Sequence, residues 1–438
     1  MIWGNKVIPL ILIILLLTVP GCSRVAGPFQ EALPVSCDVA IIGNTVAAVT
    51  AAVEASRQGA SVMVFSETDF LEAELLEEGA VAAPEETDSG EATVESRQFL
   101  REAFASSGKG LGKDWFYDLL VDNSYQDLNW YSRETGLEII PESLTRFNLA
   151  NNSPEKAQHS LIDSAASKGV LFLERVSIDG IEQSKSPPFF TIWLELNNGL
   201  KKEVSAKSVI LADGGYLNLS QLLSKHAPSV EAAPWRNLGT GKGFQLANDL
   251  NLDLVQLNYF SYGLSIQQNG QWVEAVTYPY QSVLVVGEQI MPLGGKTREQ
   301  VIGALHGDVE REGCLLVAEA QLQAHERRQC NWPVYAGINS FIEHYKLDCP
   351  DLTRWYSRPG DYYRGAKIKA MAVYCIGGVA VNENSLVLRQ GEPVPGLFAA
   401  GEITGGLHGQ SLLPGAALTE ALVFGRKAGS EAAVWALR

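Results

Sequence analysis

The feature that most constrains the fold of this sequence is an early succession of strand, turn, helix and strand. Residues 37–42 form an apolar run that ends at Gly43. A helical stretch over residues 46–58 follows, and Gly59 stops it. A second apolar run covers residues 62–65. This order predicts a parallel sheet covered by helices, the opening unit of a doubly wound α/β domain.

The turn after the first strand has part of the composition that a dinucleotide diphosphate requires. Backbone N–H groups and a helix N-terminus hold the phosphates, and a turn that usually contains three glycines lets them approach. Gly43 is the first of these glycines, whereas Thr45 and Ala48 stand at the second and third places. Glu67 follows the second strand, where an acid would hold a ribose hydroxyl. The turn alone is a weak signal, and its context strengthens it.

Strand patterns return further along the chain. Residues 189–196 alternate between apolar and polar, and Asn198 and Gly199 supply a hairpin turn. Residues 201–204 return from this turn before an apolar strand over residues 208–211. This pattern predicts a β-meander that leads back into the sheet.

The remaining chain suggests an insertion within one domain. Residues 263–365 mix helices and aromatic-rich loops without clear periodicity, and we interpret them as an inserted α+β capping domain. Strand and glycine-turn character then returns, and an amphipathic helix is expected over residues 415–437. Residues 37–262 and 366–438 are therefore the expected two parts of the nucleotide-binding domain.

Composition excludes some classes of partner. The 438 residues are enough for two domains, and 46% hydrophobic residues with 41 glycines are typical of a glycine-rich globule. The 50 acidic and 34 basic residues give a formal net charge of -16. Such a charge repels nucleic acid, which is not expected as a partner. Residues 58–96 contain many acidic and no basic side chains, a pattern typical of a solvated acidic face.

The N-terminus indicates an export signal, with Lys6 before an apolar run over residues 7–19. This run is shorter than the about 20 residues of a membrane-spanning helix, although an uncleaved anchor is an alternative. The sequence VPGC at residues 19–22 resembles a bacterial lipobox, in which the cysteine is diacylated. We expect Cys22 to anchor the protein to the periplasmic face of the cell envelope, and Ser23 suggests the outer membrane. The other alternative is an ordinary secretory signal with a chance cysteine.

The other cysteines show no metal-ligand spacing, so no metal site is expected. Cys37 and Cys375 lie in apolar, strand-like runs and are interpreted as small buried hydrophobic residues. Cys314, Cys330 and Cys349 could hold one disulfide, whose connectivity stays open.

The C-terminal stretch carries the longest match to a known pattern. Residues 395–409 are PGLFAAGEITGGLHG, followed by AL at 417–418 and VFGR at 423–426. This combination resembles the signature of the FAD-dependent fumarate reductase and succinate dehydrogenase flavoproteins. VILADGG at 209–215 resembles their second FAD motif, and TGKG at 240–243 resembles the turn that opens a following helix. The resemblance covers both ends of the mature chain and is poor through the middle.

This resemblance implies a Rossmann-like domain with FAD as the cofactor. It also implies that the start of the last helix directs N–H groups at the pyrimidine edge of the flavin, where negative charge develops on reduction. The implied cofactor-binding residues are Gly43, Thr45 and Ala48 at the diphosphate, Glu67 at the adenosine ribose, Val176 near the adenine, Ala212 and Gly214 in the second motif, Gly401 and Glu402 at the ribityl or diphosphate portion, and Ala417 and Leu418 at the pyrimidine edge.

Several positions depart from the family pattern. The family's histidine before two paired glycines falls at Val373, and an arginine after the His-Gly pair falls at Leu412. Loss of both removes the groups that offset the desolvation of a dianion, so neither fumarate nor succinate is expected as a substrate. Glu72 and Ala73 replace two glycines that touch the diphosphate in the family, a change that weakens the expected FAD binding.

Three titratable residues are candidates for catalysis. Thr297 and Arg298 resemble the family's Thr-Arg-Asp turn, whose arginine relays protons, with Glu299 in place of the acid. An exposed arginine near a helix start is the alternative. Tyr374 is a candidate acid and His408 a polar contact near the flavin, and structural packing is the alternative for both.

The sequence therefore predicts an exported, lipid-anchored FAD-dependent oxidoreductase that acts on a small, relatively apolar organic substrate. An unidentified electron donor or acceptor is the expected partner. The alternative is a non-catalytic binding protein that kept the fold while its FAD site decayed, a hypothesis suggested by Thr45, Glu72, Val373 and Leu412.

Overall fold

A computed structural model describes most of the chain after the predicted export signal. Glu72, Ala73, Cys330 and the predicted lipid-anchor residue Cys22 lie outside the described residues. Of the helices that are described, none combines the length and apolar character needed to span a bilayer. The described residues are 34–70, 80–84, 93–143, 145–149, 154–187, 189–231, 239–274, 278–306, 311–323, 326–327, 331–356 and 361–438.

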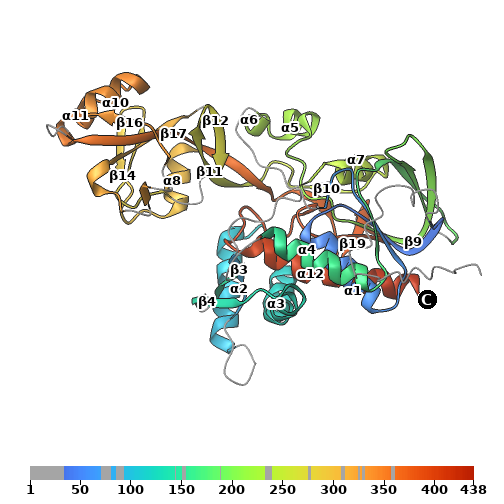
Figure 1. The fold of residues 1–438 in the computed structure, drawn as a ribbon. Coiled ribbons are helices and arrows are strands. Elements are labelled where there is room, and N and C mark those ends of the chain that lie inside the picture. Colours follow the sequence, from blue (N-terminus) through green and yellow to red (C-terminus); the bar gives the residue numbers. More distant parts are fainter. Residues whose placement is uncertain are drawn as a thin grey trace, which may run out of the picture.

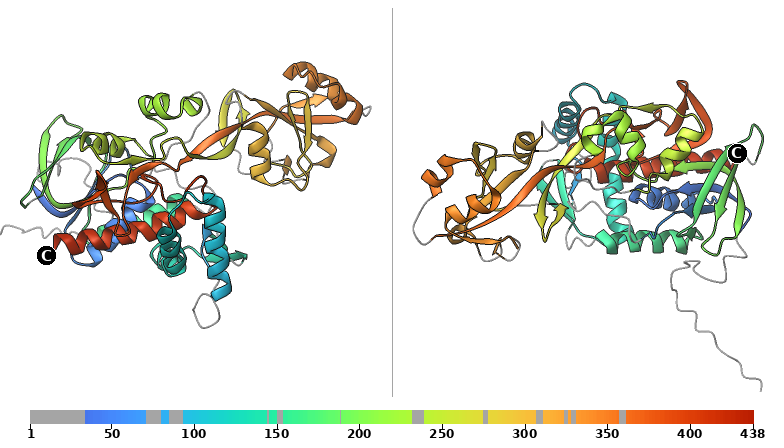
Figure 2. Two further views of the ribbon diagram at one scale, coloured as in Figure 1. Left: turned by 180° about the vertical axis from the view of Figure 1, so that it is seen from behind. Right: turned by 90° about the horizontal axis from the view of Figure 1, so that it is seen from above.

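The described chain forms two lobes (Figure 1). The larger lobe holds an eight-stranded sheet with helices packed on it, and the smaller lobe holds a seven-stranded sheet. One long strand, β17 (Tyr362–Cys375), runs from the smaller lobe into the larger one, as both views in Figure 2 show. The lobes are therefore joined by continuous secondary structure as well as by loops.

The centre of the large sheet is the predicted parallel unit. β1 (Ser36–Ile42) pairs in parallel with β2 (Val62–Phe65) on one side and with β9 (Lys201–Leu211) on the other. β6 (Leu171–Leu173) continues the parallel sheet beyond β2, and β20 (Glu392–Ala399) continues it beyond β9. β1 and β2, at the centre of the sheet, are mostly buried, as expected for continuous apolar strands of a parallel sheet. The predicted α/β fold class is confirmed.

The predicted β-meander consists of β7 (Ser177–Gln183), β8 (Phe190–Glu195) and β9, paired antiparallel in that order. Gly199 adopts a positive φ of 78° in the β8–β9 turn, which favours glycine. The expectation of two separate strands over 201–204 and 208–211 was wrong. Both belong to β9, because no turn residue interrupts the alternation between them.

Five of the described helices, each of 12 residues or more, lie in the larger lobe. The bounds of the first and the last were predicted nearly to the residue. The three between them were not predicted, because the polar residues on their faces obscure the helical spacing of the apolar ones. These helices are α1 (Val46–Arg57), α2 (Val94–Gly108), α3 (Asp114–Thr135), α4 (Pro154–Ser167) and α12 (Ala416–Ala436).

The contact between α1 and α12 depends on small residues. A Cβ atom added at Gly429 would lie 2.4 Å from the carbonyl oxygen of Ala51, and one at Gly425 would lie 2.8 Å from that of Ala47. Absence of these atoms lets the two helix backbones approach closely. The first helix, which follows the phosphate-type turn, is thereby held against the last one.

Arg426, from the C-terminal signature, connects three helices. Its guanidinium lies 3.1 Å from Glu54 of α1 and pairs with Asp127 of α3. It also lies 5.0 Å from the ring centroid of Trp130. The two carboxylates are almost fully buried, so the paired guanidinium offsets the cost of their desolvation.

In the described residues, the smaller lobe is an antiparallel sheet with the short helices α8, α10 and α11. The predicted capping segment, 263–365, begins inside β11 and ends inside β17, so its boundaries cut two strands that pair with each other. Its elements are β11 (Phe260–Gln268), β12 (Gln271–Glu274), β13 (Val283–Val286), β14 (Gln289–Pro292), α8 (Arg298–Leu305), β15 (Gly313–Ala318), β16 (Val334–Ala336), α10 (Ile338–Tyr345), α11 (Pro350–Tyr356) and β17.

Short elements complete the larger lobe and the connections. They are β3 (Ala80–Ala82), β4 (Ile139–Ser143), β5 (Arg146–Leu149), α5 (Ser220–His226), α6 (Pro228–Glu231), α7 (Lys242–Asp249), β10 (Leu254–Val255), a 3-10 turn (Glu319–Gln321), β18 (Gly378–Ala380), β19 (Leu386–Arg389) and β21 (Thr404–Gly405).

The described cysteines are free thiols. Cys37 and Cys375 are buried in strands of the core, as predicted, and burial raises the pKa of Cys37 to about 12. Cys314 and Cys349 are both buried and unbonded, so the disulfide considered for this cluster does not join these two residues.

The α1–α12 contact yields a stability prediction. We expect Gly429→Ala to lower the free energy of unfolding by about 1–3 kcal/mol, because the added methyl group overpacks against the Ala51 backbone. Gly303→Ala in α8 is the matched control, since a Cβ there meets open space, and we expect it to raise stability by up to about 1 kcal/mol through helix propensity. Urea unfolding measures both, and equal shifts in the two variants would contradict close packing at Gly429.

Candidate functional site

The β1–α1 turn packs directly on the second FAD-like motif. Gly43 adopts a φ of 131°, and a Cβ there would lie 2.1 Å from the carbonyl oxygen of Ala212. The Thr45 hydroxyl donates to the same oxygen at 2.8 Å and accepts from the N–H of Ala48 at 3.3 Å. Thr45 therefore caps α1 and ties it to Ala212. The structure brings these four sequence-predicted residues together.

Glu67 lies at the end of β2, beside the same turn. Its Oε1 accepts the N–H of Ile178 at 3.3 Å and lies 3.2 Å from Nζ of Lys242. Val176 is fully buried close by, and its N–H donates to the Ser66 carbonyl at 3.0 Å. The lysine was not predicted, because its contact with Glu67 joins segments far apart in the sequence.

Asp213 fixes the turn that carries Lys242. Its buried Oδ2 accepts the Thr240 hydroxyl at 2.8 Å and the N–H of Gly243 at 3.1 Å. Burial raises the pKa of Asp213 to about 6, although these hydrogen bonds oppose the shift. Next to it, Gly214 has a φ of 82°, and a Cβ at Gly239 would lie 1.8 Å from the Asp213 carbonyl oxygen. Only a glycine fits so close to another backbone.

The C-terminal signature reaches the same region from the other side. Gly401 has a φ of 77°, and a Cβ there would lie 2.8 Å from that of Ala47 in α1. Glu402 is buried, and its Oε1 accepts the N–H of Cys375 at 2.7 Å. The signature turn is therefore packed against the first helix and bonded to the strand that enters the cap.

The start of α12 is open towards a pocket. Its N-cap, Gly415, has a φ of 84° and no side chain to cap the helix, and the first turn holds no acidic residue. Ala417 and Leu418 line the pocket. The first N–H groups of a helix lack acceptors within it and carry partial positive charge. This helix start suits the negative charge of a reduced flavin, and Glu67, beside the β1–α1 turn, suits a ribose hydroxyl. The residues present therefore fit FAD.

The pocket has a volume of about 360 Å³ and lies where the cap meets the larger lobe. This volume is within the range of about 300–1,000 Å³ for small-molecule sites. Its apolar wall includes Val373, at the family's histidine position, and Leu412, at its arginine position. Phe260, Ile302 and Leu413 extend this wall. The substitutions noted in the sequence therefore face one cavity.

Arg298 is the sequence-predicted catalytic residue that presents a charge to this pocket. It is the first residue of α8, where Thr297 and Gln300 form a capping box. Its Nη2 lies 3.9 Å from Oε1 of Glu274, which also lines the pocket. A Cβ at Gly263 would lie 3.3 Å from Nη2, so the strand backbone passes close to the guanidinium. Glu274 and the glycine together restrict the arginine's position.

Three further polar residues of the pocket were not predicted. The rings of Tyr262 and His306 lie 4.2 Å apart between centroids. A bulge between Ser261 and Tyr262 interrupts the β11–β17 pairing here, and such bulges commonly redirect side chains near active sites. Lys109, at the end of α2, is the third residue. No spacing in the sequence links these positions, since three separate elements supply them.

Tyr374 and His408 meet at a carboxylate that was also not predicted. The Tyr374 hydroxyl donates to Oε2 of Glu420, and Nε2 of His408 lies 2.9 Å from the same oxygen. The Thr404 hydroxyl donates to Oε1 at 2.9 Å. Burial, followed by the nearby Glu420, raises the pKa of Tyr374 well above its ordinary value. Tyr374 lines the pocket with its hydroxyl engaged, whereas His408 lies behind it and does not line the pocket.

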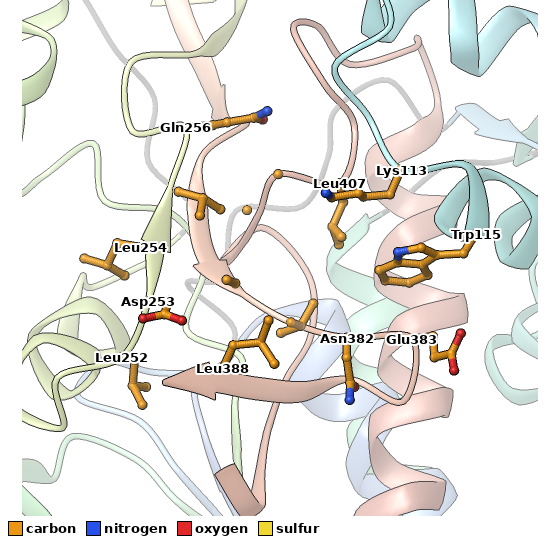
Figure 3. Close-up of a pocket in the computed structure, with 15 residues that line it drawn as sticks. Lys113, Trp115, Leu252, Asp253, Leu254, Gln256, Asn382, Glu383, Leu388 and Leu407 are labelled. Atoms are coloured by element: carbon orange, nitrogen blue, oxygen red, sulfur yellow. The ribbon is translucent and has the colours of Figure 1, made fainter. Parts of the chain in front are cut away.

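A larger groove of about 990 Å³ lies elsewhere on the larger lobe. Figure 3 shows Lys113 and Trp115 on one side of it and Leu254 and Asp253 on the other. Backbone of the signature turn contributes at Gly405–Gly406, but the groove is lined by none of the sequence-predicted site residues. The smaller pocket, which joins Arg298, Tyr374 and the start of α12, is therefore the candidate active site.

Comparisons with known proteins agree with this geometry. A probable fumarate reductase, Ifc3, of Shewanella frigidimarina is 25% identical over 282 residues, which are 53% of this chain and 45% of that protein. The chain thus spans less than half of that relative. The open flavocytochrome c3 fumarate reductase structure superposes with a TM-score of 0.77 at 18% identity, covering 93% of this chain and 80% of that one. The 3-ketosteroid Δ1-dehydrogenase of Sterolibacterium denitrificans superposes with a TM-score of 0.75 at 13% identity, covering 92% and 100%.

The FAD binding domain family matches residues 38–261 and 326–418, more than half of the chain. The matched segments contain the Gly43 turn, the second FAD-like motif and the C-terminal signature as far as Leu418. The prediction of FAD as the cofactor and of an oxidoreductase, rather than a non-catalytic binding protein, is confirmed at the level of the family. The chain therefore belongs to the FAD binding domain family and is a FAD-dependent oxidoreductase of that family.

Proposed function

We propose that this oxidoreductase carries out a two-electron redox reaction on a small, largely apolar organic substrate that binds between the cap and the FAD-binding lobe. Fumarate and succinate are not its substrates. The observation that carries the proposal is the apolar wall formed by Val373 and Leu412 in the candidate active site.

A dicarboxylate substrate needs a cation or strong donor at each end. In this pocket, the wall of Val373 and Leu412 continues through Leu413 and offers aliphatic carbon. Burying one carboxylate against such a wall costs several kcal/mol without compensation. An apolar part of a substrate gains about 25 cal/mol for each Å² that it buries on the same surface. The wall therefore selects against a second charge.

The cap supplies most of the polar side of the pocket, and Lys109 at the end of α2 adds a cation from the larger lobe. Arg298 and His306 come from α8 and the residue that follows it, and Glu274 comes from β12. A ketone or single carboxylate on the substrate would bind at this side. Arg298, restrained by Glu274 at 3.9 Å, is the proposed proton donor to substrate carbon. When bound, FAD would supply hydride transfer, and the N-terminus of α12 at Ala417 and Leu418 would stabilise negative charge that develops on it.

The two structural neighbours are named for different substrates, fumarate in one and a 3-ketosteroid in the other. The shared fold is therefore found in proteins that are named for a small dicarboxylate and for a large ketosteroid. With Val373 and Leu412 in that lining, we place the substrate of this protein nearer to the apolar class. A separate electron donor or acceptor completes the cycle.

We also propose export and lipid anchoring. This proposal rests on the sequence of residues 1–22, with Lys6, the apolar run over 7–19 and the lipobox-like VPGC. Acylation of Cys22 would hold the enzyme at the periplasmic face of the cell envelope, with the outer membrane favoured by Ser23.

Substrate choice is tested by reoxidising the dithionite-reduced protein under anaerobic conditions. We expect fumarate to reoxidise it no faster than buffer, because the apolar wall at Val373 and Leu412 lacks a partner for the second carboxylate. An apolar enone or enoate should react faster. Stopped-flow absorbance of the flavin measures each rate. Rapid turnover of fumarate would refute the substrate assignment while leaving the oxidoreductase assignment intact.

The role of Arg298 is tested by substitution. With any acceptor that reoxidises the wild-type protein, we expect Arg298→Gln to slow reoxidation about 10²–10⁴-fold, the range for loss of a proton donor. The flavin content and absorption spectrum should not change. Arg354→Gln, at an exposed position of the distal helix α11, is the matched control and should react at the wild-type rate. If both variants react alike, Arg298 is not the proton donor.

Anchoring is tested with a Cys22→Ser variant expressed in a bacterium with lipoprotein processing. The variant should move from the membrane fraction to the soluble envelope fraction, because the acylated residue is gone, and mass spectrometry should show loss of the lipid. A Ser23→Ala variant is the control and should stay with membranes. Unchanged fractionation of Cys22→Ser would count against the anchor.

A further inference from the structure

Lys242 places an unexpected positive charge in the nucleotide-binding region. Its ammonium lies 3.2 Å from Oε1 of Glu67, the acid expected at the adenosine ribose. The lysine side chain is 18% exposed and the glutamate side chain is 27% exposed. A lysine this enclosed loses side-chain freedom and hydration. An ion pair with one partly exposed carboxylate offsets only a small part of that free-energy cost. The placement suggests a second anionic partner when the cofactor is present.

The backbone around Lys242 is fixed in place. Its own N–H donates to the Thr240 hydroxyl at 3.2 Å, and that hydroxyl donates to Asp213 at 2.8 Å. Gly243, the next residue, donates to Asp213 at 3.1 Å. The lysine is therefore anchored to the turn on which Gly43 packs, since a Cβ at Gly43 would lie 2.6 Å from the Asp213 nitrogen. Asp213 therefore holds both the phosphate-type turn and the turn that carries Lys242.

The phosphate-type turn itself offers fewer donors than a three-glycine turn. Thr45 replaces the second glycine, and its hydroxyl accepts the Ala48 N–H, which removes one donor of the first turn of α1. The chain also carries a formal net charge of -16, which opposes binding of a dianionic diphosphate. A cation close to the turn would offset both effects.

We propose that Lys242 binds a phosphate oxygen of the FAD diphosphate, while Glu67 binds the adjacent adenosine ribose. The inference deepens the FAD assignment and rests on it. The two side chains form a clamp for the adenosine diphosphate half of the cofactor, in which the ammonium compensates for Thr45. A charge-assisted hydrogen bond of this kind corresponds to about ten- to hundredfold in affinity.

The test titrates FAD into apoprotein, following flavin fluorescence, for four proteins. Lys242→Met should weaken FAD binding about ten- to hundredfold, and Lys242→Arg should retain most of the affinity because it keeps the charge. Lys207→Met is the matched control, since Lys207 pairs with Asp38 at 2.8 Å at the opposite end of β1 and should not matter. Raising the salt concentration should weaken wild-type binding more than Lys242→Met binding.

Two further measurements separate a direct phosphate contact from simple neutralisation of Glu67. Riboflavin, which lacks the diphosphate, should bind the wild-type and Lys242→Met proteins equally. The double variant Lys242→Met/Glu67→Gln removes both charges. The reference for the double variant is Glu67→Gln alone, which keeps the lysine. If Lys242 binds phosphate, the double variant binds FAD about ten- to hundredfold more weakly than Glu67→Gln. If Lys242 serves only to neutralise Glu67, the double variant binds FAD as Glu67→Gln does and the proposal is overturned.

The experiment distinguishes a failure of the FAD assignment from a failure of the Lys242–Glu67 clamp. A wild-type protein that takes up no FAD would overturn the cofactor assignment and the clamp together. A wild-type protein that binds FAD, with Lys242→Met equal to it in affinity, would overturn the clamp alone. Thermal unfolding of the apoproteins, expected to be the same for Lys242→Met and Lys207→Met, confirms that the affinity change does not reflect a misfolded variant.

Discussion

The structure depends on a backbone contact that only glycine permits, between Gly43 at the end of β1 and the carbonyl of Ala212 at the end of β9. A Cβ at Gly43 would lie 2.1 Å from that oxygen. The contact brings the start of α1 against the second FAD-like motif, and the Thr45 hydroxyl strengthens it at 2.8 Å. Gly239 makes the same kind of close backbone contact with the carbonyl oxygen of Asp213. Together these contacts set the position of the nucleotide site.

The candidate active-site pocket lies where the C-terminal segment passes from the smaller lobe into the larger one. β17 crosses from the cap into the larger lobe and carries Val373 and Tyr374 to the pocket. The signature turn follows, and α12 then starts at the same pocket with its uncapped N-terminus. One continuous stretch thus supplies the apolar wall, the buried Tyr374–Glu420 contact and the helix end, while α8 of the cap adds Arg298. The chemistry that we propose for this pocket is that of a flavin beside a cavity with an apolar wall and a polar side.

Elements with a strong local pattern could be predicted from the sequence. The helix expected over 415–437 is observed as Ala416–Ala436, because glycine marks its start and small apolar residues recur with the helical period. The cap sheet could not be predicted in this way. Its strands are short, and β17 is paired with partners more than 100 residues away, such as Phe260 with Cys375. Local residues carry no signal for such pairing.

In the candidate site, too, local motifs could be predicted from the sequence, whereas contacts between distant segments could not. Positions fixed by a motif, such as Gly43 and Gly401, lie at turns that pack on β9 or α1, and their contact with FAD stays a prediction. Residues that matter through contacts between distant segments were missed, including Lys242 opposite Glu67 and Glu420 between Tyr374 and His408. Their roles follow only from the fold, which also shows that His408 stands behind the pocket rather than in its wall.

The visible absorption spectrum of the protein, purified without residues 1–22, tests the central claim most directly. The account predicts a yellow protein with the two absorption bands of oxidised flavin, bleached by dithionite and restored by air. A colourless protein that takes up no added FAD would contradict it, because the glycine contacts and the open start of α12 would then hold no cofactor.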